Sequence, residues 1–248
     1  MSTGKTTLAL LLSALLPAGA AWAAGNDTLV YCSEASPESF NPQIASSGPS
    51  FVASSQVLYN RLVSFDPVKN TPIPSLATEW HVSEDGKTWT FTLRQGVKFN
   101  SNKFFKPTRD FNADDVLFSV LRQMDPQHPY HKVSQGNYEY FHDVGLDKLI
   151  KSVKKVDDYH VQFELNEPNA AFLADWGMDF ASILSAEYGE AMLKKGTPEN
   201  VDNWPVGTGP YALQQYKVDS QIRYIANPHY WEGEVPTKHL IFSITPNV

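Results

Sequence analysis

The sequence contains no cluster of basic residues, no internal repeat and no low-complexity block. Its 20 Lys and Arg are outnumbered by 27 Asp and Glu, which gives a formal net charge of -7 at pH 7. A mildly acidic chain without basic clusters is not expected to bind nucleic acid or an anionic membrane. With 42% hydrophobic residues over 248 positions, the chain is long enough to build a packed core.

Long apolar runs are missing too. The run Leu8–Leu16 has about half the length that a permanent membrane helix requires. It follows the basic residue Lys5, and Ala21-Trp22-Ala23 has the small-x-small form that signal peptidase accepts. We predict a cleaved signal peptide over residues 1–23 and a periplasmic mature protein.

Cysteine occurs once, at Cys32. A lipoprotein signal would place small residues before this cysteine, whereas Val30 and Tyr31 precede it, so a lipid anchor is excluded. In an oxidising compartment, a single cysteine has two interpretations. It is half of a disulfide whose other half lies outside this chain, or it is a buried free thiol that packs as a small hydrophobe. The residues alone leave both open.

Motifs that indicate catalysis are also missing. The sequence has no Gly-x-Ser-x-Gly elbow, and no local signature places a histidine next to Cys32. Asp114-Asp115 and Asp157-Asp158 are adjacent pairs whose side chains diverge, so they fit a helix start and a turn better than a catalytic pair. We therefore predict that the protein is not an enzyme.

One histidine pair is a candidate for metal binding. In the sequence HPYH, His128 and His131 could share a helix face. Pro129 between them favours a loop instead, and no third ligand stands at the spacing of a zinc protease. We predict no metal site and no cofactor.

Alternating apolar and polar residues predict several strands. One covers residues 88–93, and the turn signal Asp85-Gly86 pairs it with a strand over residues 80–82. The same alternation returns over residues 159–165. Three further strands are predicted after the turn Gly207–Pro210, over residues 211–216, 221–226 and 238–245.

Helices are predicted between these strands. Asn112 caps a helix that continues to Met124, with two aspartates in its first turn. A second helix begins at Ser185 and ends at Gly196, and a shorter one is predicted over residues 54–63. Strands and helices do not alternate regularly, so we predict an α/β fold with mixed sheets.

Two loops carry side chains that suit a ligand. The sequence SSGPS, at Ser46–Ser50, offers hydroxyls and backbone groups ahead of a helix. The sequence GNYEYF places Tyr138 and Tyr140 where an amphipathic ring can face a ligand. Either segment could instead be an ordinary surface loop.

The stretch from Pro74 to Ser119 carries a longer signature. It combines Ala-x-x-Trp, Asp-Gly, an alternating strand, Leu-Arg-x-Gly-Val-Lys-Phe and an Ala-Asp-Asp-Val helix. This order resembles the extracellular solute-binding proteins of family 5, the peptide-capturing subunits of ABC importers, and their dipeptide-binding members above all. The stretches LVYCSEASPESFNPQ, HPYHKVSQGNYEYF and GTGPYALQQY agree, and the likeness extends from about Thr28 to the end.

The resemblance implies the two-lobed clamp of a type II-like (cluster C) periplasmic binding protein. This chain would supply a first segment of lobe I over residues 24–54 and a β-rich subdomain over residues 55–180. A second, truncated segment of lobe I would cover residues 181–248. Lobe II would lie outside this chain, so the chain is expected to be an N-terminal fragment.

Four site residues follow from the resemblance alone. Ser46 matches a hydroxyl residue that touches the peptide, with Ser47 and Gly48 beside it. Tyr138 matches a pocket tyrosine of lobe I. Cys32 matches a cysteine that forms a disulfide, here with a partner outside this chain. The family residues that hold the charged ends of the peptide belong to lobe II.

The function that the resemblance implies is capture of dipeptides or short peptides in the periplasm, by a monomer that delivers them to a membrane permease. The same scaffold could instead bind haem, glutathione, nickel chelates or antimicrobial peptides. An exported hydrolase or metalloprotein is the alternative from a different class, and only HPYH and the loop tyrosines favour it.

Overall fold

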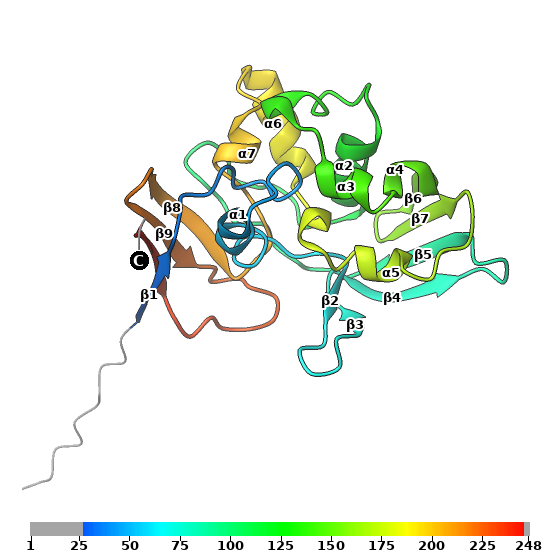
Figure 1. Ribbon diagram of the computed structural model, residues 1–248, viewed down its shortest axis with the longest axis horizontal. Coiled ribbons are helices and arrows are strands. Elements are labelled where there is room, and N and C mark those ends of the chain that lie inside the picture. Colours follow the sequence, from blue (N-terminus) through cyan, green and yellow to red (C-terminus); the bar gives the residue numbers. More distant parts are fainter. Residues whose placement is uncertain (1–26, 246–248) are drawn as a thin grey trace, which may run out of the picture.

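The computed structural model describes residues 27–245, so the predicted signal peptide lies outside the described residues. Three sheets organise this part of the chain (Figure 1). No helix within residues 27–245 is long and apolar enough to cross a bilayer. The strands are β1 (Thr28–Ser33), β2 (Val63–Phe65), β3 (Pro72–Pro74), β4 (Ala77–Val82), β5 (Thr88–Leu93), β6 (Ile150–Asp157), β7 (His160–Leu165), β8 (Tyr211–Lys217), β9 (Gln221–Ala226) and β10 (His239–Ile244).

Most of the helices lie in the upper half of the view in Figure 1. Short 3-10 turns at Val133–Gln135 and Asp179–Ala181 complete the regular structure. The helices are α1 (Gly48–Ala53), α2 (Ala113–Met124), α3 (Glu139–Asp143), α4 (Leu146–Leu149), α5 (Phe172–Asp175), α6 (Ala186–Lys195) and α7 (Asn200–Asn203).

The first four-stranded sheet joins the two ends of the described chain. Its strand order is β1-β10-β9-β8, with β1 parallel to β10 and the other neighbours antiparallel. This pairing confirms the three strands predicted after Gly207–Pro210 and the prediction of a mixed sheet. Tyr224, Leu240 and Phe242 are buried on its inner face.

The second four-stranded sheet is antiparallel, with the order β4-β5-β7-β6. Val82 pairs with Trp89 across the turn that holds Gly86, whose φ of +71° suits glycine. Phe91 and Phe163 are buried, as the alternation predicted. Helix α2 packs against β6 and β7, while β2 and β3 form a separate two-stranded ribbon.

Helix α2 begins as its sequence predicts. The Asn112 side chain accepts a hydrogen bond from the Asp114 N–H, and the Asp115 carboxylate accepts one from the Asn112 N–H, which completes a capping box. Helix α6 likewise starts at the cap Ser185 and ends at Gly196 in the left-handed region. Local signals therefore predicted both helices correctly.

The prediction of a helix over residues 54–63 is wrong. The helix in this region is α1, which ends before the predicted segment begins. Ser54 leaves helical geometry at φ −125° and ψ −78°, and its hydroxyl donates to the Ser50 carbonyl. Serine hydroxyls that bond to the carbonyl four residues earlier slightly destabilise and often bend a helix, which is consistent with a break at this position.

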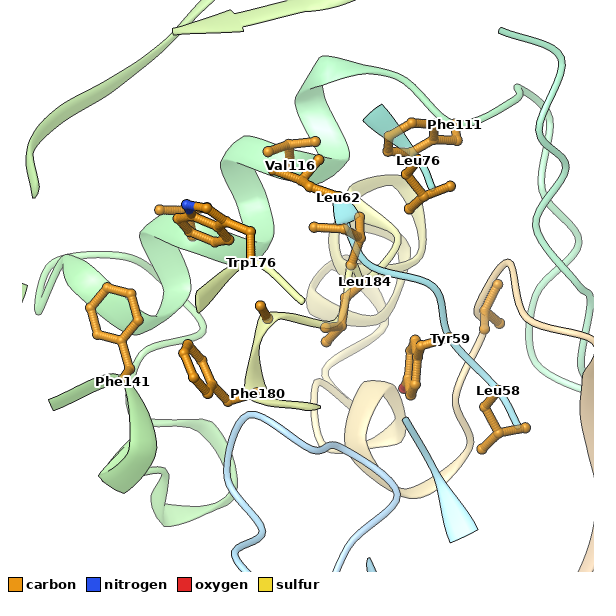
Figure 2. Packing of buried hydrophobic residues seen from close by; sticks show 14 of the residues in the cluster. Leu58, Tyr59, Leu62, Leu76, Phe111, Val116, Phe141, Trp176, Phe180 and Leu184 are labelled. Atoms are coloured by element: carbon orange, nitrogen blue, oxygen red, sulfur yellow. The ribbon is translucent and has the colours of Figure 1, made fainter. Parts of the chain in front are cut away.

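The apolar core is continuous between the two four-stranded sheets. Figure 2 shows Trp176 and Phe180 near α2 and Phe141. The Trp176 ring centroid lies 4.9 Å from that of Phe163 and 5.8 Å from that of Phe172, at tilted and edge-on angles that favour aromatic contact. The segment that carries Trp176 therefore ties sheet β4-β5-β7-β6 to the rest of the core.

Asp175, at the edge of this core, is expected to make the free energy of unfolding depend on pH. Burial raises the pKa of Asp175 from 3.8 to about 6, and its carboxylate has no hydrogen-bond or ion-pair partner among residues 27–245. The folded state therefore holds this proton more tightly than the unfolded state, and the free energy of unfolding falls as pH rises between these two values.

We expect Asp175→Asn to raise the free energy of unfolding at pH 7 by about 1 kcal/mol, after discounting for partial solvent exposure. At pH 4 the carboxyl is protonated in the folded wild type and partly protonated in the unfolded state, so most of the loss of stability has not yet developed and the gain should be small there. Urea unfolding at the two pH values measures the difference. An equal effect at both values would show that burial of this charge does not control stability.

Candidate functional site

Ser46, Ser47 and Gly48 lie where the chain enters α1. Ser46 and Gly48 are exposed, and the Ser46 hydroxyl makes no hydrogen bond to residues 27–245. Ser47 is the N-cap, but its Oγ lies 2.9 Å from Ser50 Oγ instead of capping the helix. The Ser46 hydroxyl is thus open to a ligand, while Ser47 is engaged in local structure.

The segment 44–48, called the serine segment below, is anchored by polar residues that precede it. The Asn41 carbonyl accepts hydrogen bonds from the Ile44 and Ala45 N–H groups, which closes a turn. The Gln43 side chain donates to the Ser119 carbonyl of α2 at 3.0 Å. The turn at Asn41 and the amide N–H bond of Gln43 fix the entry to the serine segment.

Tyr140 stands beside the serine segment. Its hydroxyl lies 3.5 Å from the Ser46 carbonyl oxygen, and its ring packs edge-on against Phe51, with centroids 5.5 Å apart. The side chain is half-buried, so part of the ring faces solvent next to Ser46. The structure therefore brings Tyr140 close to the predicted serine site.

Tyr138, the predicted pocket tyrosine, lies beneath the surface and is only 1% exposed. Its hydroxyl accepts a hydrogen bond from Arg122 Nε at 3.2 Å and donates to the His131 carbonyl at 2.9 Å. Burial raises the pKa of Tyr138, although Arg122 opposes the shift. Tyr138 supports its loop from below, and its contact with a ligand stays a prediction.

The loop 133–140, called the tyrosine loop below, has an unusual backbone. Ser134, Gln135 and Tyr138 have φ values of 56°, 56° and 51°, a left-handed region that residues with side chains rarely occupy. A Cβ added at Gly136 would lie 2.8 Å from the Ile44 side chain. The tyrosine loop and the serine segment are thus in direct contact.

A buried ion pair lies under the tyrosine loop. Arg122 Nη1 and Nη2 lie 2.8 Å from the two carboxylate oxygens of Asp202, and the side chains are 0% and 1% exposed. Burial disfavours the charged guanidinium, but the Asp202 carboxylate outweighs this and raises the pKa of Arg122 above its ordinary value. Arg122 is therefore charged in the folded protein.

The HPYH histidines are parts of the packed structure. His128 packs edge-on against Phe118, with ring centroids 5.3 Å apart, and burial lowers its pKa. His131 Nδ1 lies 2.9 Å from the Arg122 carbonyl oxygen. Within residues 27–245, no group of three or more His, Cys, Asp or Glu side chains is placed to hold a metal ion.

The adjacent aspartate pairs point to separate partners, as predicted. Asp115 binds Arg109, whereas Asp114 binds Lys155. Asp157 Oδ1 accepts from the Tyr159 N–H in the turn between β6 and β7. These contacts account for the carboxylates as parts of a cap and a turn.

Cys32 is exposed on β1, in register with Ser243 of β10. The interpretation of Cys32 as a buried free thiol is therefore wrong for this chain. An exposed thiol at a sheet edge is accessible to a second cysteine, but the predicted disulfide stays a prediction.

Most of the chain matches a known protein family. The family model described as "Bacterial extracellular solute-binding proteins, family 5 Middle" matches residues 71–248. The chain is 58% identical over 245 residues to the dipeptide-binding protein of Escherichia coli K12, which covers 99% of this chain and 45% of that protein. It is 51% identical over 222 residues to heme-binding protein A of Haemophilus influenzae, covering 90% and 41%.

A solved structure has the same fold. The dipeptide-binding protein from Pseudoalteromonas sp. SM9913, in complex with Met-Leu, superposes with a TM-score of 0.87 at 46% identity. The match covers 89% of this chain and 43% of that one. The chain thus spans less than half the length of the relatives that it matches, and it has the mixed α/β fold of the matching part.

Proposed function

The chain belongs to the bacterial extracellular solute-binding proteins of family 5, and from this premise we propose that it is part of a periplasmic protein that captures dipeptides or short peptides for an ABC importer. Members of this family are solute-binding proteins, not enzymes, and we propose the same for this chain. The observation that carries the proposal is the 58% identity to a dipeptide-binding protein over nearly the whole chain.

The geometry of the serine segment supports this proposal. The exposed hydroxyl of Ser46, which has no hydrogen-bond partner among residues 27–245, lies next to the half-buried ring of Tyr140, on a surface held by buried polar anchors. Small polar ligands are held by a few well-placed polar groups against apolar or aromatic walls. We propose that Ser46, Ser47 and Gly48 line this site together with Tyr140. Tyr138 supports the site from below.

The remaining part of the clamp would complete the site. We propose that residues 24–54 and 181–248 belong to lobe I, that residues 55–180 form its β-rich subdomain, and that lobe II carries the groups for the peptide ends. Charge-assisted bonds to both ends select length, while wet side-chain pockets admit varied sequences. Closure of two lobes excludes water and strengthens the end contacts.

Calorimetry on the full-length protein tests the proposal. A panel of dipeptides should bind, whereas the same dipeptides with an acetylated amino end and an amidated carboxyl end should not. This chain alone should bind neither set. Hydrolysis of a dipeptide by the full-length protein, abolished by a chelator, would instead support an exported metallohydrolase.

Ser46→Ala is expected to weaken dipeptide binding to the full-length protein by about 0.5–1.5 kcal/mol, the net value of one ordinary hydrogen bond. Calorimetry measures the change. Ser101→Ala removes an exposed hydroxyl from a different loop and is the matched control. Unchanged affinity in a folded Ser46→Ala variant would count against a ligand contact at this position.

Haem is a second candidate ligand, because the chain is also 51% identical to heme-binding protein A. A competition experiment decides between the two. If dipeptides are the ligand, haemin should change neither their affinity nor the absorbance spectrum of the protein. Displacement of a bound dipeptide by stoichiometric haemin would favour haem.

We propose that the mature protein is a periplasmic monomer that begins at Ala24 and that Cys32 is oxidised in it. The cysteine partner would lie in the part of the protein outside this chain. Mass spectrometry of the exported full-length protein, without reduction, should show the Ala24 terminus and a Cys32-containing disulfide peptide. A retained Leu8–Leu16 segment or an alkylatable Cys32 would contradict the corresponding half of this prediction.

A further inference from the structure

We propose that the buried Arg122–Asp202 pair is a positioning element that sets the serine segment and the tyrosine loop in place for the ligand. This inference rests on the proposed peptide-binding function and extends it to residues that do not touch the ligand. It follows from the way three separate segments, those of Asn41, Arg122 and Ser134, converge on the buried carboxylate of Asp202.

The Asp202 carboxylate of α7 connects both segments. Its Oδ1 accepts a hydrogen bond from Asn41 Nδ2 at 2.8 Å, and Asn41 closes the turn that enters the serine segment. Its Oδ2 accepts one from Ser134 Oγ at 2.6 Å, and Ser134 belongs to the tyrosine loop. One side chain thus holds both ligand-facing segments by charge-assisted bonds.

Arg122 holds the tyrosine loop at further points. Its Nε donates to the Tyr138 hydroxyl, near the end of the loop, while Ser134 near the start is bound by Asp202. The Arg122 carbonyl oxygen also lies 2.9 Å from His131 Nδ1, just before the loop. The ion pair and its partners therefore fix the loop along its length.

The backbone of the loop explains why this support affects geometry as well as stability. Ser134 and Tyr138 occupy the left-handed region, which is unfavourable for residues with side chains and persists only where surrounding contacts impose it. Both residues bond directly to the ion pair. Without these bonds the loop should relax, and its contacts with Ile44 and Ser46 should change.

Buried ion pairs often add little net stability, because desolvation of the charges offsets their attraction. A pair that organises several segments can instead specify one arrangement of the surface above it. The expected result of weakening the Arg122–Asp202 pair is therefore a loss of ligand affinity larger than the loss of stability explains.

A second arginine–aspartate pair, in which the aspartate is buried and the arginine is partly exposed, provides the control. Asp115 is also fully buried and bound to an arginine, Arg109, and it accepts bonds from the Asn112 and Ala186 N–H groups. It bonds to neither the serine segment nor the tyrosine loop. Asp115→Asn and Asp202→Asn each remove one buried charge and keep the size of the side chain.

The test compares these variants in the full-length protein, with Met-Leu as the probe, at a temperature where both are folded. We expect Asp202→Asn to weaken Met-Leu binding about tenfold and Asp115→Asn by less than about twofold, while both lower the Tm. Hydrogen exchange at residues 133–138 should accelerate only in Asp202→Asn. Equal changes in affinity, or none in either variant, would overturn the proposal.

Ser134→Ala keeps the test decisive if Asp202→Asn does not fold. Ser134 is exposed, so its substitution removes the bond to Asp202 without emptying the core. It should accelerate exchange in the tyrosine loop and weaken binding with little change in Tm. If the wild type binds no dipeptide, the proposed function fails, whereas unaltered loop exchange in Ser134→Ala contradicts the positioning role.

Discussion

Trp176→Ala is expected to lower the free energy of unfolding by about 3–5 kcal/mol, which is the usual cost of truncating a large buried aromatic residue. Trp176 is 1% exposed, and its ring contacts Phe163 of β7 and Phe172 of α5. Its carbonyl oxygen also accepts the Val63 N–H of β2. The substitution would open a cavity where three elements meet, and urea unfolding measures its cost.

Trp176→Phe separates the effect of the indole N–H from that of the aromatic contacts. The Trp176 indole N–H is buried without a hydrogen-bond partner among residues 27–245, which is itself unfavourable. Phenylalanine removes that N–H and keeps most of the aromatic contact, so its cost should be less than half that of alanine. Equal destabilisation by both variants would contradict this account of the core.

The parts of the fold that the sequence predicted correctly depend on local interactions. The capping box at Asn112 joins residues three apart, and the turn at Gly86 joins neighbouring strands. Both can be recognised within a few positions. The strands around them follow from alternation because one side of each faces the core.

The helix predicted over residues 54–63 failed because distant contacts decide that segment. The Leu58 and Val57 carbonyl oxygens accept hydrogen bonds from the Gly209 and Tyr211 N–H groups. The backbone groups that a helix would use internally are bound to a loop about 150 residues away in sequence. No local pattern over residues 54–63 carries that information.

In the candidate site, too, some features could be predicted from the sequence, whereas others depend on distant contacts. The resemblance indicated the serine segment, and its exposed hydroxyl is consistent with that role. Which tyrosine of GNYEYF faces the surface depends on Arg122, because the guanidinium draws Tyr138 inward and leaves Tyr140 beside Ser46. A single arginine within the apolar pattern of α2 was the available signal for a buried partner, and the sequence alone did not identify Asp202 as that partner.

Gly207→Ala is expected to lower the free energy of unfolding by about 4 kcal/mol or more, a loss that few single substitutions cause. A Cβ at Gly207 would lie 2.0 Å from the Leu58 carbonyl oxygen, and one at Gly209 would lie 2.5 Å from the Leu58 carbonyl carbon. Neither glycine has a positive φ, so the close approach of two backbones, and not an unusual conformation, requires glycine here.

This clash cannot be relieved by moving a flexible side chain. The Gly207 carbonyl oxygen accepts the Asn100 N–H at 2.8 Å, and the Leu58 carbonyl oxygen accepts the Gly209 N–H at 3.0 Å. Any shift that makes room for a methyl group disturbs the backbone bonds that join Gly207 to Asn100 and Gly209 to Leu58. The cost is therefore expected even though only one carbon atom is added.

Gly48→Ala is the matched control for Gly207→Ala. A Cβ at Gly48 would have no atom within 4 Å, and the residue has no positive φ. Alanine there should leave the free energy of unfolding unchanged or raise it by about 0.5 kcal/mol, because it restricts the unfolded chain. Thermal and urea unfolding of both variants measure the contrast. A Gly207→Ala protein as stable as Gly48→Ala would show that the two backbones do not approach this closely.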